Sequence, residues 1–209
     1  MIKRLLLILA LIIPNFGFTK EWNFDVYLDK SKIGQHTFRL SDGNQLVSQA
    51  NFNVKLFFIN AYSYQHMAVE HWQEGCLKSL DSNTIENKVT TKVKGKLSDS
   101  GFEVYDGKTK QILSQCPMTF AYWSQKILQQ SKLLNPQNGE WLDIKVSKVG
   151  KEMLEVKGQQ VDTLHYKLSA SLVDKPRLNI DLWYKAQNND WVALKSITPE
   201  GYAINYKLR

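Results

Sequence analysis

The chain has 209 residues, of which 43% are hydrophobic and 11% aromatic, and this is enough material for one well-buried domain. The formal net charge is +7, but the lysines are scattered along the sequence rather than clustered. This distribution argues against a nucleic-acid-binding protein.

The N-terminus has the features of a secretory signal peptide. Basic residues 3–4 precede an unbroken apolar run over 5–13, and small residues follow up to Thr19. The alternative is a membrane anchor, but the run is only about half of the roughly 20 apolar residues that a spanning helix needs. We predict that 1–19 is cleaved and that 20–209 forms a single periplasmic domain with no remaining transmembrane segment. No cysteine lies near the cleavage site, so a lipoprotein anchor is not expected.

The first half of the expected mature chain alternates apolar and polar residues with period two, which is typical of strands with one buried side. This pattern covers 22–28, 46–58 and 89–97. Turn-forming pairs such as Glu74-Gly75 separate the runs. Short links of this kind predict antiparallel hairpins.

Residues 116–141, "CPMTFAYWSQKILQQSKLLNPQNGEW", break the alternation. Phe120, Trp123 and Ile127 are spaced at i, i+3 and i+7, which favours a helix with one apolar side. We predict a short helix over about 119–130 that plugs the apolar face of a curved sheet. Its aromatic side chains either fill the core, which is their commoner role, or also contact a ligand.

Period-two alternation resumes after this insert, over 142–147, 164–172, 178–184 and 202–208. A flat sheet with one apolar side would leave that side in water, so the sheet must be covered or must curl. The predicted fold is therefore mainly β, either a single curved antiparallel sheet or a half-open β-barrel.

Cys76 and Cys116 are the two cysteines of the chain. In an exported protein, a pair of cysteines favours a disulfide bond. Two buried thiols or a redox pair are the alternatives, although redox pairs usually have the closer C-x-x-C spacing. Two cysteines alone make a poor metal site, and no metal or cofactor is predicted.

Five segments together resemble a bacterial exported family of unknown function, with FAYW and LLNPQxGE as the most specific motifs. The segments are "WNFDVYLDKSKIGQHTFRL" (22–40), "HWQEGCL" (71–77), "CPMTFAYW" (116–123), "LLNPQNGE" (133–140) and "WVALKSITPEGYAINYKLR" (191–209). The resemblance implies an exported β-rich domain whose curved sheet is similar to periplasmic lipoprotein-carrier folds. It implies no catalytic residues.

The sequence contains no G-x-S-x-G elbow, P-loop, H-E-x-x-H or dinucleotide fingerprint. His66 shares a strand face with Tyr62, Tyr64 and Trp72, where a hydrogen-bonded core histidine is the commoner interpretation. His165 lies on a polar face and is expected to be solvated. An enzyme is therefore the third-ranked hypothesis.

The leading hypothesis is a non-enzymatic binding module for a lipidic or other apolar molecule. The competing hypothesis is a structural or interaction protein of the cell envelope, with a filled core and a protein partner. Nucleic acid is not an expected partner of either. The predicted ligand-contact residues are Phe52, Phe58, Tyr64, Trp72, Phe120, Trp123 and Ile127.

Overall fold

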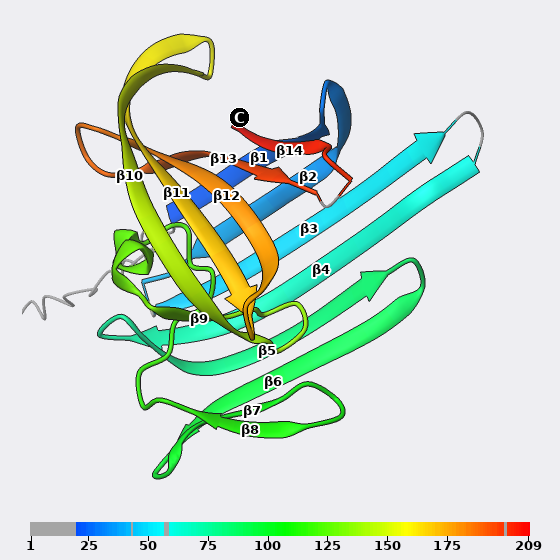
Figure 1. Cartoon of the computed structure of the whole chain (residues 1–209), viewed down its shortest axis with the longest axis vertical. Helices are drawn as coiled ribbons and strands as arrows, with labels where there is room; N and C mark the ends of the chain where they lie inside the picture. Colours follow the sequence, from blue (N-terminus) through cyan, green and yellow to red (C-terminus); the bar gives the residue numbers. More distant parts are fainter. Residues whose placement is uncertain (1–19, 43, 57–58, 199) are drawn as a thin grey trace, which may run out of the picture.

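The structure, a computed structural model, describes residues 20–42, 44–56, 59–198 and 200–209, so the predicted signal peptide lies outside the described part. Strands make up most of the chain (Figure 1). Before the insert they are β1 Lys20–Leu28, β2 Ser31–Leu40, β3 Gln45–Leu56, β4 Ile59–Gln73, β5 Cys76–Glu86, β6 Val89–Ser98, β7 Gly101–Tyr105 and β8 Lys110–Leu113. The strands that follow residue 131 of the insert are β9 Lys132–Leu134, β10 Trp141–Val156, β11 Gln159–Leu172, β12 Lys175–Lys185, β13 Trp191–Ile197 and β14 Ala203–Leu208.

All of these strands belong to one antiparallel sheet, in the order β8-β7-β6-β5-β4-β3-β2-β1-β14-β13-β12-β11-β10-β9. The first and last strands pair with each other in the middle of the sheet, with Val26 of β1 opposite Tyr206 of β14. The edges of the sheet are β8 and β9, which are not paired with each other. The prediction of a mainly β fold with a single curved antiparallel sheet is confirmed, and the structure shows that this sheet is unclosed.

The sheet curls so that β9–β12 cross in front of β1–β6 (Figure 1). We call β9–β12 the front wing and β1–β6 the back wall. Strand twist supplies part of this curl, and bulges add to it. The ladder shifts register between Lys148 and Gly150 of β10, and between His71 and Trp72 of β4.

The predicted alternation sets the inner face of the sheet. In β1, Trp22, Phe24 and Val26 are buried, and the side chains between them are partly exposed. One expected position differs, because Tyr202 precedes β14 and is exposed. The inner faces of the two layers meet in one large core cluster.

The part of the insert that precedes β9, residues 116–131, crosses the interior and is hydrogen-bonded to both layers; from here on we call this part the insert. The N–H of Leu77, in the back wall, donates to the carbonyl of Pro117 at 3.1 Å. One residue later, the carbonyl of Met118 accepts from the N–H of Leu134, in the front wing, at 2.8 Å. Thr119 and Leu134 also form a parallel bridge. Residues 117–119 therefore join the two layers directly.

The predicted helix over about 119–130 is wrong. Only Gln125–Gln129 are helical, as a short 3-10 helix that Ser124 caps. Before it, the amides of Ala121 and Tyr122 donate two residues back, to the carbonyls of Thr119 and Phe120, and these are tight turns rather than the i to i−4 bonds of an α-helix. The apolar spacing of Phe120, Trp123 and Ile127 reflects packing into the interior rather than a helix face. Among the described residues, no helix is long and apolar enough to cross a membrane.

The predicted disulfide between Cys76 and Cys116 is present, with the two Cα atoms 4.7 Å apart. That separation lies in the usual range for a disulfide. The bond joins the start of β5 to the start of the insert, beside the Leu77–Pro117 hydrogen bond. It therefore fixes the point at which the insert enters the interior.

Glu70 of β4 is a carboxyl group buried beneath the insert, with 3% of its surface exposed. Burial raises the pKa of Glu70 to about 7, while hydrogen bonds from Thr119 and Trp72 partly offset this effect. The indole N–H of Trp72 donates to Glu70 at 3.0 Å. The carboxyl thus contacts both its own strand and the insert.

We expect Ile127→Ala to lower the free energy of unfolding by about 2–5 kcal/mol, because it leaves a cavity at a fully buried position. Gln129→Ala, on the exposed side of the same 3-10 helix, is the matched control and should stay within about 0.5 kcal/mol of wild type. Urea melts measure both values. Equal melts for the two variants would show that the insert does not fill the core.

Reduction of the disulfide should lower stability by about 3–4 kcal/mol, because the bond closes a loop of 40 residues. The double variant Cys76→Ser/Cys116→Ser should melt like the reduced wild type and should not respond to reductant. Denaturant melts with and without a phosphine reductant test this. Superimposable wild-type melts would contradict the stabilising role of the bond.

Glu70→Gln should gain stability relative to wild type as the pH rises. The raised pKa means that the folded protein keeps a proton that the unfolded chain releases above 4.5. The stability linked to that proton is therefore complete below 4.5 and is lost as the pH rises through about 7. Comparing variant with wild type at each pH cancels the other titrating groups. The difference should grow by about 3 kcal/mol between pH 4 and pH 8.

The control for this titration is Glu155→Gln, which changes an exposed carboxyl group on β10. Its difference from wild type should stay constant over the same pH range. A constant difference for Glu70→Gln as well would mean that the pKa of Glu70 is the same in the folded protein as in the unfolded chain, contrary to its position under the insert.

Candidate functional site

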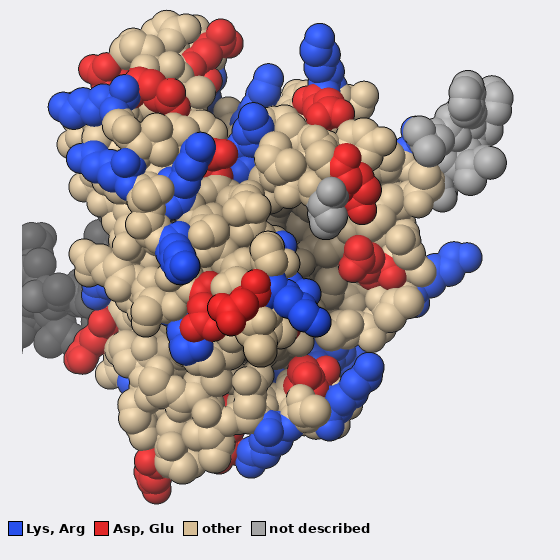
Figure 2. Space-filling model, in the orientation of Figure 1, with Lys and Arg blue, Asp and Glu red and all other residues tan. Residues whose placement is uncertain are grey.

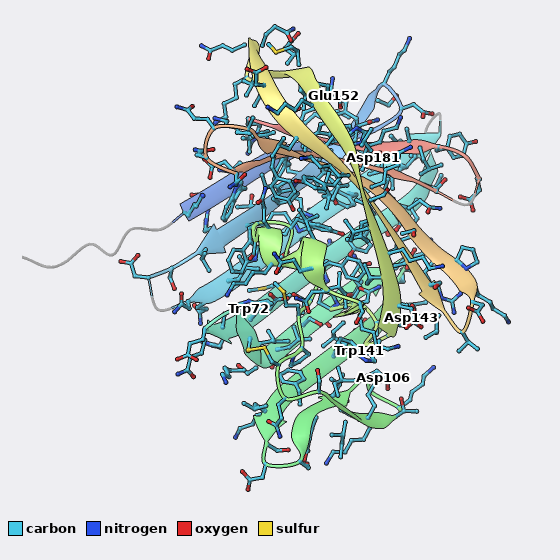
Figure 3. All side chains as sticks on the ribbon, turned by 60° about the vertical axis from the view of Figure 1, so that its left-hand side comes forward. Trp72, Asp106, Trp141, Asp143, Glu152 and Asp181 are labelled. Carbon is cyan, nitrogen blue, oxygen red and sulfur yellow. A yellow bond between two sulfur atoms is a disulfide. The ribbon has the colours of Figure 1, made fainter. Side chains whose placement is uncertain are left out.

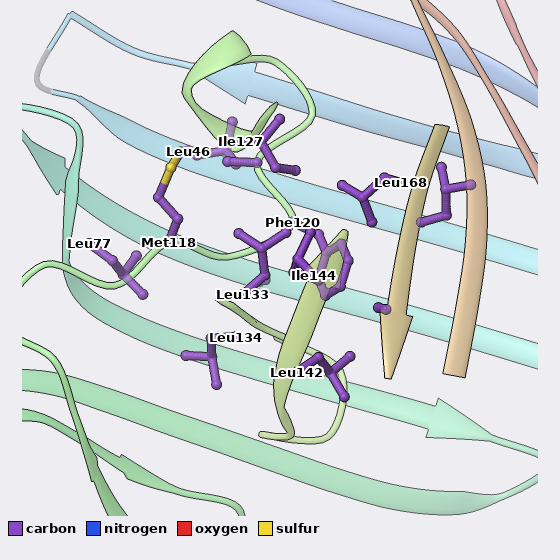
Figure 4. Close-up of a cluster of buried hydrophobic side chains, with 14 of the residues drawn as sticks. Leu46, Leu77, Met118, Phe120, Ile127, Leu133, Leu134, Leu142, Ile144 and Leu168 are labelled. Atoms are coloured by element: carbon purple, nitrogen blue, oxygen red, sulfur yellow. The ribbon is translucent and has the colours of Figure 1, made fainter. Parts of the chain in front are cut away.

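The first group of predicted ligand-contact residues lies at the end of the half-barrel that the insert plugs. The rings of Trp72 and Trp123 meet edge to face, with centroids 5.6 Å apart. Phe120 and Ile127 belong to the main core and are 8% and 0% exposed. Figure 4 shows Phe120 and Ile127 among the buried side chains between the two layers. The structure therefore brings these four residues together.

The second group lies toward the other end of the back wall, near the β3–β4 and β5–β6 turns. Phe52 and Tyr64 stack there with ring centroids 5.2 Å apart, in a smaller core cluster that is separate from the main one. Phe58 lies outside the described residues. The structure thus splits the predicted contact set into two groups at two ends of the interior.

The plugged end is occupied by the chain's own side chains. Ile127, Leu133 and Leu142 are fully buried there (Figure 4). Trp123 is half-buried, and its indole N–H is enclosed without a hydrogen-bond partner in the part of the chain that the structure describes. A ligand at this end would have to displace packed core residues.

The other end carries a row of aromatic and polar side chains on the inner face of the back wall. We call Phe52, Tyr62, Tyr64, His66, Thr84 and Glu86 the mouth site. Because they lie two apart on β4, Tyr62, Tyr64 and His66 point to the same side. Their rings are nearly parallel, with successive centroids 6.5 and 6.3 Å apart. The result is a continuous aromatic wall.

Polar contacts tie this wall to its neighbours. The hydroxyl of Tyr62 donates to Glu86 at 3.0 Å. Thr84 donates to the carbonyl of Gln137 at 3.1 Å, and its hydroxyl lies 2.9 Å from Nδ1 of His66. The turn around Gln137 leads into β10, so these bonds also hold the front wing against β5.

A recess of about 400 Å3 lies beside the mouth site. It is lined by Thr84, Glu86, Asn87, Val89, Thr91, Gln137 and Asn138. In the space-filling view the molecule is hollowed to the right of centre, between the front wing and the back wall (Figure 2). The curled sheet is therefore filled at one end and open at the other.

Deeper in the interior, His36 bonds through both ring nitrogens. Nε2 lies 2.8 Å from Ser48 Oγ, and Nδ1 lies 3.2 Å from the hydroxyl of Tyr206. Acyl transfer by such a serine–histidine pair would also need donors aimed at a developing oxyanion. Ser48 lies in the middle of β3, paired with Phe38 and Ala68. Strand pairing uses the nearby backbone amides, so they cannot serve as donors to an oxyanion. We therefore interpret the His36–Ser48 pair as a structural hydrogen bond between neighbouring strands rather than a catalytic pair.

The titratable rings around the mouth are uncharged near neutral pH. Burial lowers the pKa of His66 to about 4 and holds the pKa of His36 well below its usual value. Burial likewise raises the pKa of the Tyr64 and Tyr206 hydroxyls. Glu86 is the one charged side chain among the residues that line the recess. This surface suits apolar contact combined with hydrogen bonding.

Sequence reasoning did not identify His36, Ser48 and Thr84 as part of a polar interior. All three are buried at inward positions; the inward residues next to His36 and Ser48 include Phe38 and Leu46, whereas Thr84 follows the polar Ser82. Polar residues at inward positions are the signal that could have found them. Alternation alone did not show that His36 on β2 would bond to Ser48 on β3, or that Thr84 on β5 would bond to His66 on β4.

A second polar cluster lies on the front wing, away from the mouth. His165, expected to be solvated, stacks on Trp183 and is largely buried between Glu152 and Asp181. Figure 3 labels the two acidic residues on this wing. Both ring nitrogens of His165 have an acidic partner within the front wing. In the described ranges, no group of three or more histidine, cysteine or acidic side chains could hold a metal ion.

Comparison with known proteins agrees with this architecture. The crystal structure of a β-barrel-like protein of domain of unknown function DUF1849 from Brucella abortus is similar, with a TM-score of 0.68 over 90% of this chain and 94% of that chain. The two sequences are 10% identical, so the likeness concerns the fold alone. A search of curated proteins gave no match. The family model described as Domain of unknown function (DUF6134) matches residues 24–209, and the chain therefore belongs to that family.

Proposed function

We propose that this protein is an exported binding module that holds a small apolar or amphipathic molecule at the mouth of its half-barrel. One observation carries the proposal: Thr84 and Glu86 line a recess of about 400 Å3, and Glu86 accepts a hydrogen bond from Tyr62 of the aromatic wall behind it. Small-molecule sites are typically concave, about 300–1,000 Å3 in volume, and rich in aromatic side chains with a few polar groups. The mouth site has this character.

The proposal moves the ligand from the insert to the opposite end of the interior. Residues such as Ile127 fill the plugged end, so their contribution is indirect. The insert joins the front wing to the back wall, and this connection holds the mouth in one shape. Such preorganisation favours affinity because less freedom is lost on binding.

Export to the periplasm is part of the same proposal. Its supports are the signal-like residues 1–19 and the Cys76–Cys116 disulfide, since disulfides persist in oxidising compartments.

An envelope interaction protein is the second candidate. The observation in its favour is a groove of about 710 Å3 on the outer face, beside the edge strand β8. Its lining includes Lys78, Lys94, Lys96 and Lys110, with Asp81 and Glu103 among them. A protein that acted through this groove would not depend on the inner face.

Val89→Trp should weaken binding of the uncharged fluorescent probe N-phenyl-1-naphthylamine at least about tenfold. Val89 is 68% exposed and lines the recess, so a larger side chain there narrows the opening without disturbing the core. Thr90→Trp is the matched control, because the neighbouring residue on β6 is also exposed but points to the other side of the sheet. Fluorescence titration measures both affinities.

Trp123→Phe distinguishes the two ends of the interior. If the ligand occupies the mouth, this variant should bind the probe as wild type does. Loss of binding in Trp123→Phe, with Val89→Trp unaffected, would place the ligand at the plugged end. Absence of probe binding to wild type would favour the interaction protein.

A further inference from the structure

One ring nitrogen of His66, a member of the mouth site, has no hydrogen-bond partner in the described part of the chain, and the neighbouring threonine determines which nitrogen it is. The hydroxyl of Thr84 has a single hydrogen, which it donates to the carbonyl of Gln137. That hydroxyl therefore acts as the acceptor toward Nδ1 of His66, 2.9 Å away. It follows that Nδ1 carries the proton.

A neutral imidazole has one N–H, so Nε2 of His66 is an unprotonated acceptor. Burial keeps the ring neutral, since it lowers the pKa of His66 to about 4. Nε2 lies at the far end of the ring from β4, and it has no hydrogen-bond partner among residues 20–42, 44–56, 59–198 and 200–209. The side chain is 4% exposed, and Nε2 is left as an acceptor that a ligand can use.

The charges around this nitrogen favour a particular ligand chemistry. The residues that line the recess include no lysine or arginine, and they include the carboxyl group of Glu86. Glu86 accepts from Tyr62 and so remains close to the aromatic wall. An anionic headgroup would find no cationic partner in this lining and would meet a carboxylate.

We infer that the mouth site selects a non-anionic amphipathic ligand that donates a hydrogen bond, through a hydroxyl or N–H group, to Nε2 of His66. The aromatic wall formed by Phe52, Tyr62 and Tyr64 contacts the apolar part of the same ligand. Fatty acids and other anionic lipids are thereby disfavoured. This inference rests on the proposed function and adds the chemical class of the ligand.

Three probes with one aromatic skeleton separate the effects. N-phenyl-1-naphthylamine is uncharged and has an N–H. Its N-methyl analogue is uncharged but lacks the N–H, and 8-anilino-1-naphthalenesulfonate keeps the N–H but adds a negative charge. Wild type should bind the first probe about tenfold more tightly than either of the others, as expected for one lost hydrogen bond or one unfavourable charge.

Two variants of His66 test whether Nε2 is the acceptor. In His66→Asn the amide nitrogen takes the place of Nδ1 and keeps the bond to Thr84, but no acceptor remains at the position of Nε2. In His66→Gln the side-chain oxygen reaches that position. The preference for the N–H probe over its N-methyl analogue should disappear in His66→Asn and persist in His66→Gln.

The outcomes separate this inference from the proposed function. If no probe binds in a manner sensitive to Val89→Trp, the proposed function is wrong. If binding is sensitive to Val89→Trp but the N-methyl or anionic probe binds as tightly as the parent, the inference is wrong and the binding module stands. An unchanged probe preference in His66→Asn would also overturn the inference. The wild-type probe series remains decisive if either His66 variant fails to fold.

Discussion

The structure depends on one constraint: a single fourteen-stranded sheet with an apolar inner face has to be covered. The sheet does not close, because its edge strands β8 and β9 remain unpaired with each other. The chain meets the constraint by curling the sheet and by passing its own insert through the interior. Hydrogen bonds from Leu77 and Leu134 to consecutive carbonyls of the insert hold the two layers on it. The disulfide fixes where the insert enters.

This solution makes the two ends of the interior different. The insert enters beside the β4–β5 turn and fills that end with side chains such as Ile127 and Trp123. The chain turns back into β10 before it reaches the other end. At this turn the hydroxyls of Ser82 and Thr84 donate to the carbonyls of Pro136 and Gln137. Beside this turn lies the recess that adjoins the mouth site. The filled end matches the sequence-based hypothesis of a protein with a filled core. The open end matches the hypothesis of a binding module, which we propose.

Much of the fold could be predicted because strand alternation is a local property. Trp22, Phe24 and Val26 are recognisable as inward residues from their spacing alone, and the disulfide follows from an exported pair of cysteines. The helix over about 119–130 failed because contacts with neighbouring strands, including the Thr119–Leu134 bridge, hold the start of this segment, and tight turns rather than helical bonds follow. The pairing of β1 with β14 and the neighbourhood of His66, Thr84 and Gln137 are long-range facts that no single segment encodes. The predicted contact residues were chosen mainly because they are aromatic, since the sequence does not show which of them are neighbours in space. The structure therefore places them at both ends of the interior.

The central claim is that the interior is plugged at one end and receives a ligand at the other. Nuclear Overhauser contacts between N-phenyl-1-naphthylamine and the aromatic protons of the protein test it most directly, because the two ends carry different rings. The account predicts contacts from the probe to Tyr62 and Tyr64, with none to Trp72 or Trp123. Contacts to the two tryptophans instead would contradict it, because the insert would then yield to a ligand rather than fill the core.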